Sequence, residues 1–311
     1  MSTLQNLAAR AGNEAIQVNP NVADLDLGPA GSDFLWMVFS VMAASGLGSM
    51  IWGFRVERGQ RAFHYLSAAI LATASVAYFS MASDLGATPI TVEFLQGNEL
   101  VNGMYPKRAI WYVRYIDWTI TTPLLLLEIL LVSGLPLSTI FITIFFDLVM
   151  IITGLVGALV QSTYKWGYFT MGCVAMFYVF YVLYGPGLKS AGALGAEYKK
   201  AYLYSTSILC FLWFIYPIAW GLCDGGNVID TNAEMYWYGI LDILAKPVFA
   251  FFHLWEMRGL DYNKLALKSG KFSEFEIGSK AVAEANEGGL HIKQAEADVA
   301  HSSRQAELGT Q

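Results

Sequence analysis

Seven long apolar stretches constrain this 311-residue chain more than any other feature. Each approaches or exceeds the ~20 mostly apolar residues that a helix needs to cross the hydrocarbon core of a bilayer. The runs are too long for the strands of a membrane β-barrel, and they lack the alternation of such strands. The sequence therefore predicts an all-α membrane protein, a bundle of seven transmembrane helices over residues 33–54, 62–83, 108–131, 136–160, 165–187, 199–222 and 232–257.

The composition agrees with this class. Hydrophobic residues make up 55% of the chain and charged residues 14%, whereas about 25% of a typical soluble domain is charged. The charges also gather at the ends, with 15 in residues 258–311. We therefore expect an N-terminal segment (1–32), a seven-helix domain (33–257) and a flexible tail (258–311). The net charge of −6 argues against a nucleic-acid partner, and the three cysteines lack the spacing of a metal site.

The loops predict an orientation in the membrane. Four Lys or Arg residues fall on the side of the N-terminus, and nine fall on the other side when the start of the tail is included. Because cytoplasmic loops are enriched in Lys and Arg, we expect the N-terminus outside and the C-terminus in the cytoplasm. Residues 1–32 show no cleavable signal peptide, and the plasma membrane is the expected location. Residues 90–95 are expected to form a hairpin arm, and residues 279–286 a short helix in the tail.

Six ionisable residues remain well inside the predicted helices. Each costs at least about 2.5 kcal/mol at a helix centre on insertion scales, and an intramembrane charge is by default a functional hypothesis. The alternative is a set of structural ion pairs or of groups near the interface. The six are Arg114, Asp117, Glu128, Asp147, Asp242 and Lys246.

The spacing on the third predicted helix places several of these groups on one face. Asp117 follows Arg114 by three residues and Thr121 follows Asp117 by four, so the three side chains are neighbours. Glu128 lies eleven residues after Asp117, nearly three whole turns and about 16 Å along the axis. One helix thus offers two proton-binding carboxyl groups at two depths.

The seventh and sixth predicted helices supply a lysine and an aromatic stripe. Asp242 and Lys246 are four residues apart, which sets the carboxylate beside the amine, and lysine amines form Schiff bases with carbonyl compounds. Trp213, Tyr216 and Trp220 share one helical face, next to Pro217. Alone, such a stripe is more typical of core packing. Beside a buried lysine and carboxylates it favours a slot for a long apolar ligand.

Three motifs on these helices resemble the microbial (type 1) rhodopsins, most closely the fungal, bacteriorhodopsin-like branch. They are RYIDWTITTPLLLLE at 114–128, WFIYPIAW at 213–220 and DILAK at 242–246, in the family's order. The resemblance covers roughly residues 33–257. It implies a retinal protein with the seven-helix microbial rhodopsin fold.

The resemblance also implies roles around the chromophore. Lys246 matches the lysine that holds all-trans retinal covalently as a protonated Schiff base. Asp117 matches the primary counterion and proton acceptor, and Asp242 the second counterion. Arg114 matches the arginine that couples the counterions to the outer side. Thr121 matches the threonine bonded to the acceptor carboxylate.

Further matches extend the implied site toward both membrane faces. Glu128 matches the cytoplasmic proton donor, while Glu234 and Asp224 match the outer proton-release region. Asp147 matches a buried acid that bonds Thr122. The positions that match the walls of the retinal pocket or their supports are Trp118, Trp213, Tyr216, Trp220, Pro217, Tyr115, Thr122, Met150 and Gly154.

The leading functional hypothesis is a light-driven outward proton pump, which is not an enzyme and whose partners are retinal, protons and the lipid bilayer. The rival is a slow-cycling photosensory rhodopsin that signals through a partner, for which the tail offers a docking segment. Glu128 favours the pump, because a sensor needs no fast proton donor. A channel and a retinal-free receptor are weaker alternatives, and the sequence leaves the oligomeric state open.

Overall fold

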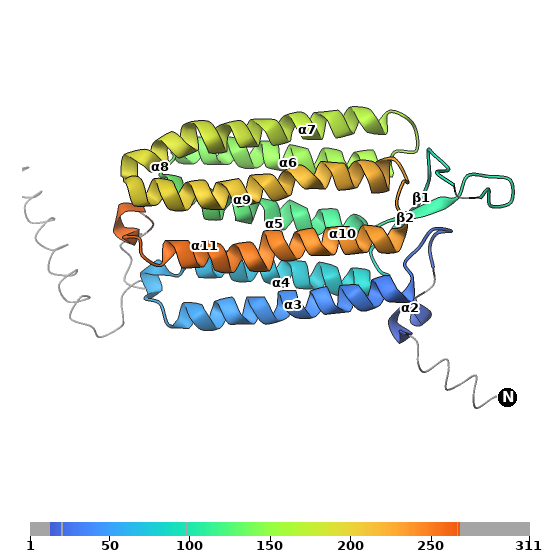
Figure 1. Cartoon of the computed structure of the whole chain (residues 1–311), viewed down its shortest axis with the longest axis horizontal. Helices are drawn as coiled ribbons and strands as arrows, with labels where there is room; N and C mark the ends of the chain where they lie inside the picture. Colours follow the sequence, from blue (N-terminus) through green and yellow to red (C-terminus); the bar gives the residue numbers. More distant parts are fainter. Residues whose placement is uncertain (1–12, 20, 98, 266, 268–311) are drawn as a thin grey trace, which may run out of the picture.

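The computed structural model describes residues 13–19, 21–97, 99–265 and 267. Long helices lie side by side and form a bundle with one long axis (Figure 1). Most of the predicted tail, including the helix expected at 279–286, lies outside the described residues.

All seven predicted helices are present. The first four are α3 (Pro29–Phe54), α4 (Ala62–Ala82), α5 (Tyr112–Ser133) and α6 (Leu137–Leu159). The fifth joins α7 (Lys165–Val182), η2 (Leu183–Gly187) and α8 (Leu188–Leu194), and the sixth joins α9 (Ala196–Trp220) to η3 (Gly221–Gly225). The seventh joins α10 (Thr231–Ile243), η4 (Leu244–Val248) and α11 (Phe249–Met257). Within the described residues, the first six are long and apolar enough to cross a membrane.

The last three helices each contain one π-helical segment, namely η2, η3 and η4. Pro186 lies inside η2 and Pro247 inside η4. Proline cannot donate a backbone hydrogen bond, and a π-helical turn accommodates the interrupted ladder. Such segments are frequent at functional sites, and Lys246 lies within η4.

The connections differ from the prediction at one point. Residues 108–110 were expected to begin the third helix, but they belong to strand β2 (Lys107–Ile110), which pairs antiparallel with β1 (Thr88–Thr91). Leu25 also pairs with β2, because its N–H donates to Lys107 O and its carbonyl accepts from Ala109 N. These extended pairings delay the helix to Tyr112. The predicted hairpin is therefore longer than residues 90–95 and projects from one end of the bundle (Figure 1).

The remaining elements are short and lie at the ends of the bundle (Figure 1). They are α2 (Glu14–Val18), η1 (Arg58–Gln60) and η5 (Tyr262–Leu265). Between the ends, α3 packs on α4, α4 on α5, α6 on α7, and α10 returns to α3. Gly239 allows the last of these contacts, because a Cβ there would lie 2.5 Å from the ring of Phe34.

Two carboxyl groups meet at the end of the bundle that carries the hairpin. Asp84, just after α4, is 4% exposed and has a left-handed backbone with φ of 56°. The Asp26 carboxyl is close enough to act on it electrostatically, while the oxygens of Asp26 accept the backbone N–H groups of Val22, Ala23 and Leu27. Burial, with the Asp26 carboxyl as the second cause, raises the pKa of Asp84 to about 7.

We expect Asp84 to make the folded protein less stable as pH rises. Its folded pKa lies above the ordinary value of 3.8, so its contribution is fully present below that value and is lost as pH rises through about 7. Asp84→Asn should remove this part of the pH dependence and keep the backbone, since Asn tolerates the left-handed conformation. Thermal unfolding in detergent between pH 4 and 8 measures it, with the exposed Glu14→Gln as control. A midpoint whose pH dependence is the same in Asp84→Asn and wild type would contradict the assignment.

Candidate functional site

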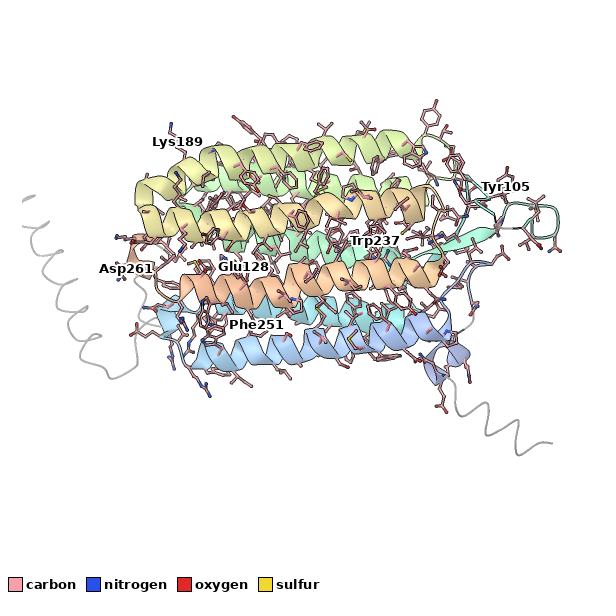
Figure 2. The ribbon with its side chains drawn as sticks, viewed as in Figure 1. Tyr105, Glu128, Lys189, Trp237, Phe251 and Asp261 are labelled. Atoms are coloured by element: carbon pink, nitrogen blue, oxygen red, sulfur yellow. The ribbon has the colours of Figure 1, made fainter. Side chains whose placement is uncertain are left out.

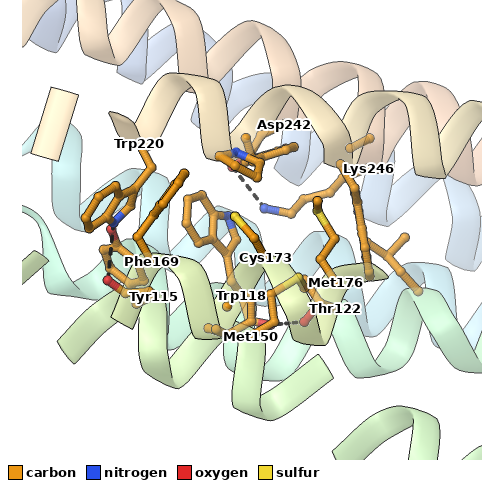
Figure 3. A pocket seen from close by; sticks show the side chains of 18 residues that line it. Tyr115, Trp118, Thr122, Met150, Phe169, Cys173, Met176, Trp220, Asp242 and Lys246 are labelled. Atoms are coloured by element: carbon orange, nitrogen blue, oxygen red, sulfur yellow. Dashed lines mark hydrogen bonds and ion pairs between the residues drawn. The ribbon is translucent and has the colours of Figure 1, made fainter. Parts of the chain in front are cut away.

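A cavity with an empty volume of about 760 Å³ lies between α5, α6, α7, α9 and the seventh helix (Figure 3). Nearly all of its wall is apolar, and the exceptions gather around Lys246. All of the predicted pocket positions line it, namely Trp118, Thr122, Met150, Gly154, Trp213, Tyr216, Pro217, Trp220 and Lys246. Several further residues line the wall without any signal in the sequence that marks them, namely Ile151, Phe169, Cys173 and Met176. Phe169, Cys173 and Met176 recur at helical spacing on α7, but an apolar face on a membrane helix does not distinguish a cavity from lipid.

Lys246 enters this cavity between two carboxylates. Its Nζ lies 2.6 Å from Asp117 Oδ2 and 2.9 Å from Asp242 Oδ2, and all three side chains are almost completely buried. Figure 3 shows the amine pointing along the cavity and linked by a dashed line toward Asp242. The predicted cluster of one lysine and two acids is therefore assembled in space.

The two carboxylates have different surroundings. Asp242 accepts hydrogen bonds from Tyr78 at 2.7 Å and from Tyr216 at 2.5 Å, so both of its oxygens are bound. Asp117 Oδ2 faces Lys246, while its Oδ1 has no hydrogen-bond partner among the described residues. Asp117 therefore retains a free acceptor site beside the amine. Tyr78, which lies on α4, carries no sequence signal that would have identified it.

Thr121 and Arg114 depart from their predicted contacts. The Thr121 hydroxyl donates to the main-chain oxygen of Asp117 at 2.9 Å and not to the carboxylate, because a helical threonine readily bonds the carbonyl four residues earlier. Arg114 was also predicted to neighbour Asp117 on this face of the helix. Its guanidinium pairs with Glu234 instead, at 2.7 Å, and lies 4.0 Å from the ring of Tyr238.

Aromatic rings give the cavity its shape. The Trp118 ring meets that of Tyr216 edge-on with centroids 5.3 Å apart, and Phe169 stacks on Trp220 at 5.0 Å. Trp220 Nε1 donates to Gly154 O at 3.2 Å, which fixes the orientation of its ring in the cavity wall. An apolar slot with aromatic walls and a buried primary amine at one end fits a long conjugated aldehyde bound through that amine.

The far wall is held by a hydrogen bond between helices. Thr122 on α5 donates to Asp147 Oδ2 on α6 at 2.8 Å, and this is the contact that the resemblance implies. At Gly172 on α7, a Cβ would lie 3.0 Å from Thr153 Oγ1. The glycine therefore lets α7 approach α6 closely at this end of the slot.

Glu128 lies on α5 toward the opposite end from the hairpin, the end that also carries Lys189 and Asp261 (Figure 2). It is 0% exposed and accepts a hydrogen bond from Ser67 at 2.6 Å. Its Oε2 has no partner, and no cation lies within ion-pair distance, in the part of the chain that the structure describes. Its neighbours in sequence on α5, Leu126, Ile129 and Leu130, belong to the buried apolar core. The single serine partner could not be read from the sequence.

Four more charged groups lie on the hairpin side of Lys246, namely Glu234, Asp224, Arg108 and Lys165. Glu234 binds both Arg114 and Arg108, each at 2.7 Å, and Asp224 accepts a hydrogen bond from Tyr115 at 2.7 Å. Arg108 and Lys165 were predicted to begin the third and fifth helices, and they are 2% and 1% exposed. Arg108 belongs to strand β2 of the hairpin, and the sequence does not show how far this connection folds back over the bundle.

Comparisons with known proteins agree with this geometry. The family model for Bacteriorhodopsin-like protein matches residues 30–259. The chain is 52% identical to Protein FDD123 of Trametes versicolor, over 85% of this chain and 90% of that protein. It is 46% identical to Opsin-like protein carO of Fusarium fujikuroi, over 82% and 84% of the two chains.

A solved structure shows the same fold. The crystal structure of the light-driven proton pump Coccomyxa subellipsoidea rhodopsin CsR aligns with a TM-score of 0.69 and 36% identity, over 74% of this chain and 98% of that one. The family implies a retinal chromophore. The chain therefore belongs to the bacteriorhodopsin-like family of microbial rhodopsins, the fungal opsins among them.

Proposed function

We propose that this chain is a light-driven outward proton pump that binds all-trans retinal covalently through Lys246. The observation that carries the proposal is the placement of two buried carboxyl groups on one helix, Asp117 beside the amine and Glu128 remote from it. A relative of known structure, the Coccomyxa rhodopsin, is a light-driven proton pump. Retinal, when bound, supplies a double bond that light isomerises and so reorients the nitrogen of Lys246.

The residues on the outer side of Lys246 receive the proton. Asp117 Oδ2 lies 2.6 Å from Nζ and Oδ1 is free among the described residues, so this carboxylate can accept a proton from the nitrogen. Both oxygens of Asp242 are occupied by tyrosine hydroxyl donors, so it offers no free acceptor site. It therefore acts as the fixed counter-charge, and Asp117 as the acceptor.

The residues on the other side return a proton. Glu128 has a serine as its only hydrogen-bond partner in the described chain and no cation beside it, so its neutral form is the one that its apolar surroundings favour. In that form it can donate a proton to the Lys246 nitrogen once Asp117 has taken the first. Direction results from an acceptor and a donor on opposite sides of one nitrogen.

The proposal includes an orientation and a location. The N-terminus and the hairpin lie outside, Glu128 faces the cytoplasm, and the protein resides in the plasma membrane as a transporter without enzymatic activity. Outward transport then follows from the order of Glu128, Lys246 and Asp117 along the bundle. Two further predictions are that the protein forms a homo-oligomer and that its tail binds a cytoplasmic partner.

Illumination should acidify the medium around cells that express the protein and are supplied with retinal. The exposed-lysine variant Lys189→Ala should acidify like wild type, and a protonophore should abolish the signal. External pH under continuous light is the measurement. The photosensory alternative predicts a coloured protein with a slow photocycle and no external acidification, and that result would overturn the pump.

Lys246→Ala should form no covalent retinal pigment, because no other lysine amine reaches the cavity within the described residues. Denaturation in acid followed by chromatography distinguishes covalent from released retinal. Covalent retinal in Lys246→Ala would show that the attachment site is wrong. Lys189→Ala is again the control and should keep the pigment.

Glu128→Gln should slow the return of the proton to the Lys246 nitrogen by about 100-fold, the scale of a lost general acid. Flash photolysis follows that return as the decay of the deprotonated species. The matched control is Glu197→Gln, which alters a carboxyl group with a side chain that is 63% exposed. An unchanged decay in Glu128→Gln would remove this residue as the donor.

A further inference from the structure

His253 is a buried histidine that the pump mechanism does not use. It lies on α11, which extends toward the end of the bundle opposite the hairpin (Figure 1). It follows Lys246 by seven residues, about 10 Å along the helix axis, and is 1% exposed. A polar ring buried among apolar side chains is costly unless its nitrogens are bound, so its presence here needs an explanation.

Ser205 on α9 holds one side of the His253 ring. The Ser205 Oγ lies 2.9 Å from Nδ1 in a buried hydrogen bond. The other ring nitrogen, Nε2, has no partner among the described residues. A neutral imidazole carries one N–H group and one lone pair. When the N–H at Nδ1 donates to the serine oxygen, the lone pair on Nε2 is free to bind a proton.

The His253 ring lies beside Glu128. The rings of His253 and Phe63 meet with centroids 5.5 Å apart. Ser67, one turn after Phe63 on α4, donates to Glu128 Oε1 at 2.6 Å. His253 is also close enough to the main chain of Glu128 to interact with it. One turn of α4 therefore contacts both groups, and each group keeps one atom, Nε2 of the ring and Oε2 of the carboxyl, without a partner in the described chain.

Few other titratable groups lie near this ring. His64 on α4 has no hydrogen-bond partner for either ring nitrogen in the part of the chain that the structure describes. Tyr262 on η5 packs against Phe63 with ring centroids 5.7 Å apart. Neither histidine nor Glu128 forms an ion pair within the described residues. Burial therefore favours the neutral forms of His253 and Glu128 at rest, since neither has an opposite charge beside it.

We propose that His253, positioned by Ser205, is the group from which Glu128 regains its proton. This inference rests on the proposed pump, in which Glu128 first gives a proton to the Lys246 nitrogen. A proton from the aqueous end opposite the hairpin then adds to the lone pair of the ring, and the new carboxylate of Glu128 stabilises the resulting cation. The N–H bond breaks, the proton passes through one bridging water, and an O–H bond forms on Glu128. The ring is neutral again.

This order makes proton uptake depend on the preceding step. The ring gains a partner of opposite charge only after Glu128 has lost its proton, and a buried cation without such a partner is strongly disfavoured. His253 is therefore charged only during the interval in which Glu128 is a carboxylate. A proton cannot enter from this end while Glu128 still holds its own.

Time-resolved infrared spectroscopy after a flash tests this step. The carboxylic C=O band of Glu128, identified by its absence in Glu128→Gln, should vanish as the proton leaves and return as Glu128 is reprotonated. His253→Gln should slow the return by about 100-fold, the scale of a lost proton-transfer group, and leave the vanishing unchanged. A glutamine amide can bond Ser205 but carries no exchangeable charge. Ser207→Ala, which removes a half-buried hydroxyl from the same helix α9, is the matched control and should behave like wild type.

The outcomes separate this inference from the pump itself. A Glu128 band that vanishes and returns at the same rates in His253→Gln and wild type overturns the relay and leaves the donor role of Glu128 intact. A wild type in which the band never vanishes overturns that donor role, and the relay with it. Both results are read from the spectra and do not require the acidification assay.

An isotope label in the histidine rings identifies the carrier directly. A band of the protonated ring should be present in wild type between the loss and the return of the Glu128 band. The chain has four histidines, so the band is assigned by its absence in His253→Gln. A histidine that only holds helices together would give no such band. Its absence in wild type overturns the inference, even if His253→Gln does not fold.

Ser205 is tested by a conservative pair. Ser205→Ala removes the hydrogen bond that orients the ring and should slow the return of the Glu128 band by about fivefold, as expected for one hydrogen bond. Ser205→Thr keeps the hydroxyl and should restore the wild-type rate. A return that is equally fast in Ser205→Ala and wild type would remove Ser205 as the positioning residue.

Discussion

The ion pair of Lys246 with two carboxylates is the interaction on which the rest of the molecule depends. A buried ammonium without a partner is expelled from a membrane interior or loses its charge. Removing one member of a buried pair costs about 3–5 kcal/mol. In this fold the ammonium group of Lys246 forms ion pairs with Asp117 from α5 and with Asp242, which lies one turn earlier on the same helix. Tyr78 and Tyr216 then fix Asp242, so four helices converge on one nitrogen.

Much of the fold could be predicted because the bilayer leaves few choices. An apolar stretch long enough to span must be a helix, since only a helix satisfies its own backbone in lipid. The error at residues 108–110 arose where that constraint ends. Outside the hydrocarbon, Arg108 and its neighbours are free to pair with β1 and Leu25. Hydropathy alone does not separate a buried strand from the first turn of a helix.

The candidate site also contains residues that could be predicted from the sequence and residues that could not. Residues on one helix face, such as Asp117 and Glu128, could be grouped from spacing alone, and the family motifs located the pocket around Lys246. Partners supplied singly by another element could not be found, and Tyr78 and Ser67 are the examples. The burial of charged residues near helix ends could not be predicted, for a related reason. The sequence does not show that the hairpin folds over Lys165 and encloses it.

The buried carboxyl groups fall into two kinds, according to whether both of their oxygens are bound. Asp242 and Glu234 each have both oxygens bound by donors, and such groups hold charge in place. Asp117, Glu128, Asp147 and Asp224 each keep one oxygen without a partner among the described residues, and an incompletely bound buried polar group in a folded protein needs an explanation. A fully bound and a partly bound carboxyl group therefore lie together at Lys246, as Asp242 and Asp117. The cost of burying charge in a membrane is met in the first kind by two hydrogen-bond or ion-pair donors, whereas the second kind retains a free acceptor site.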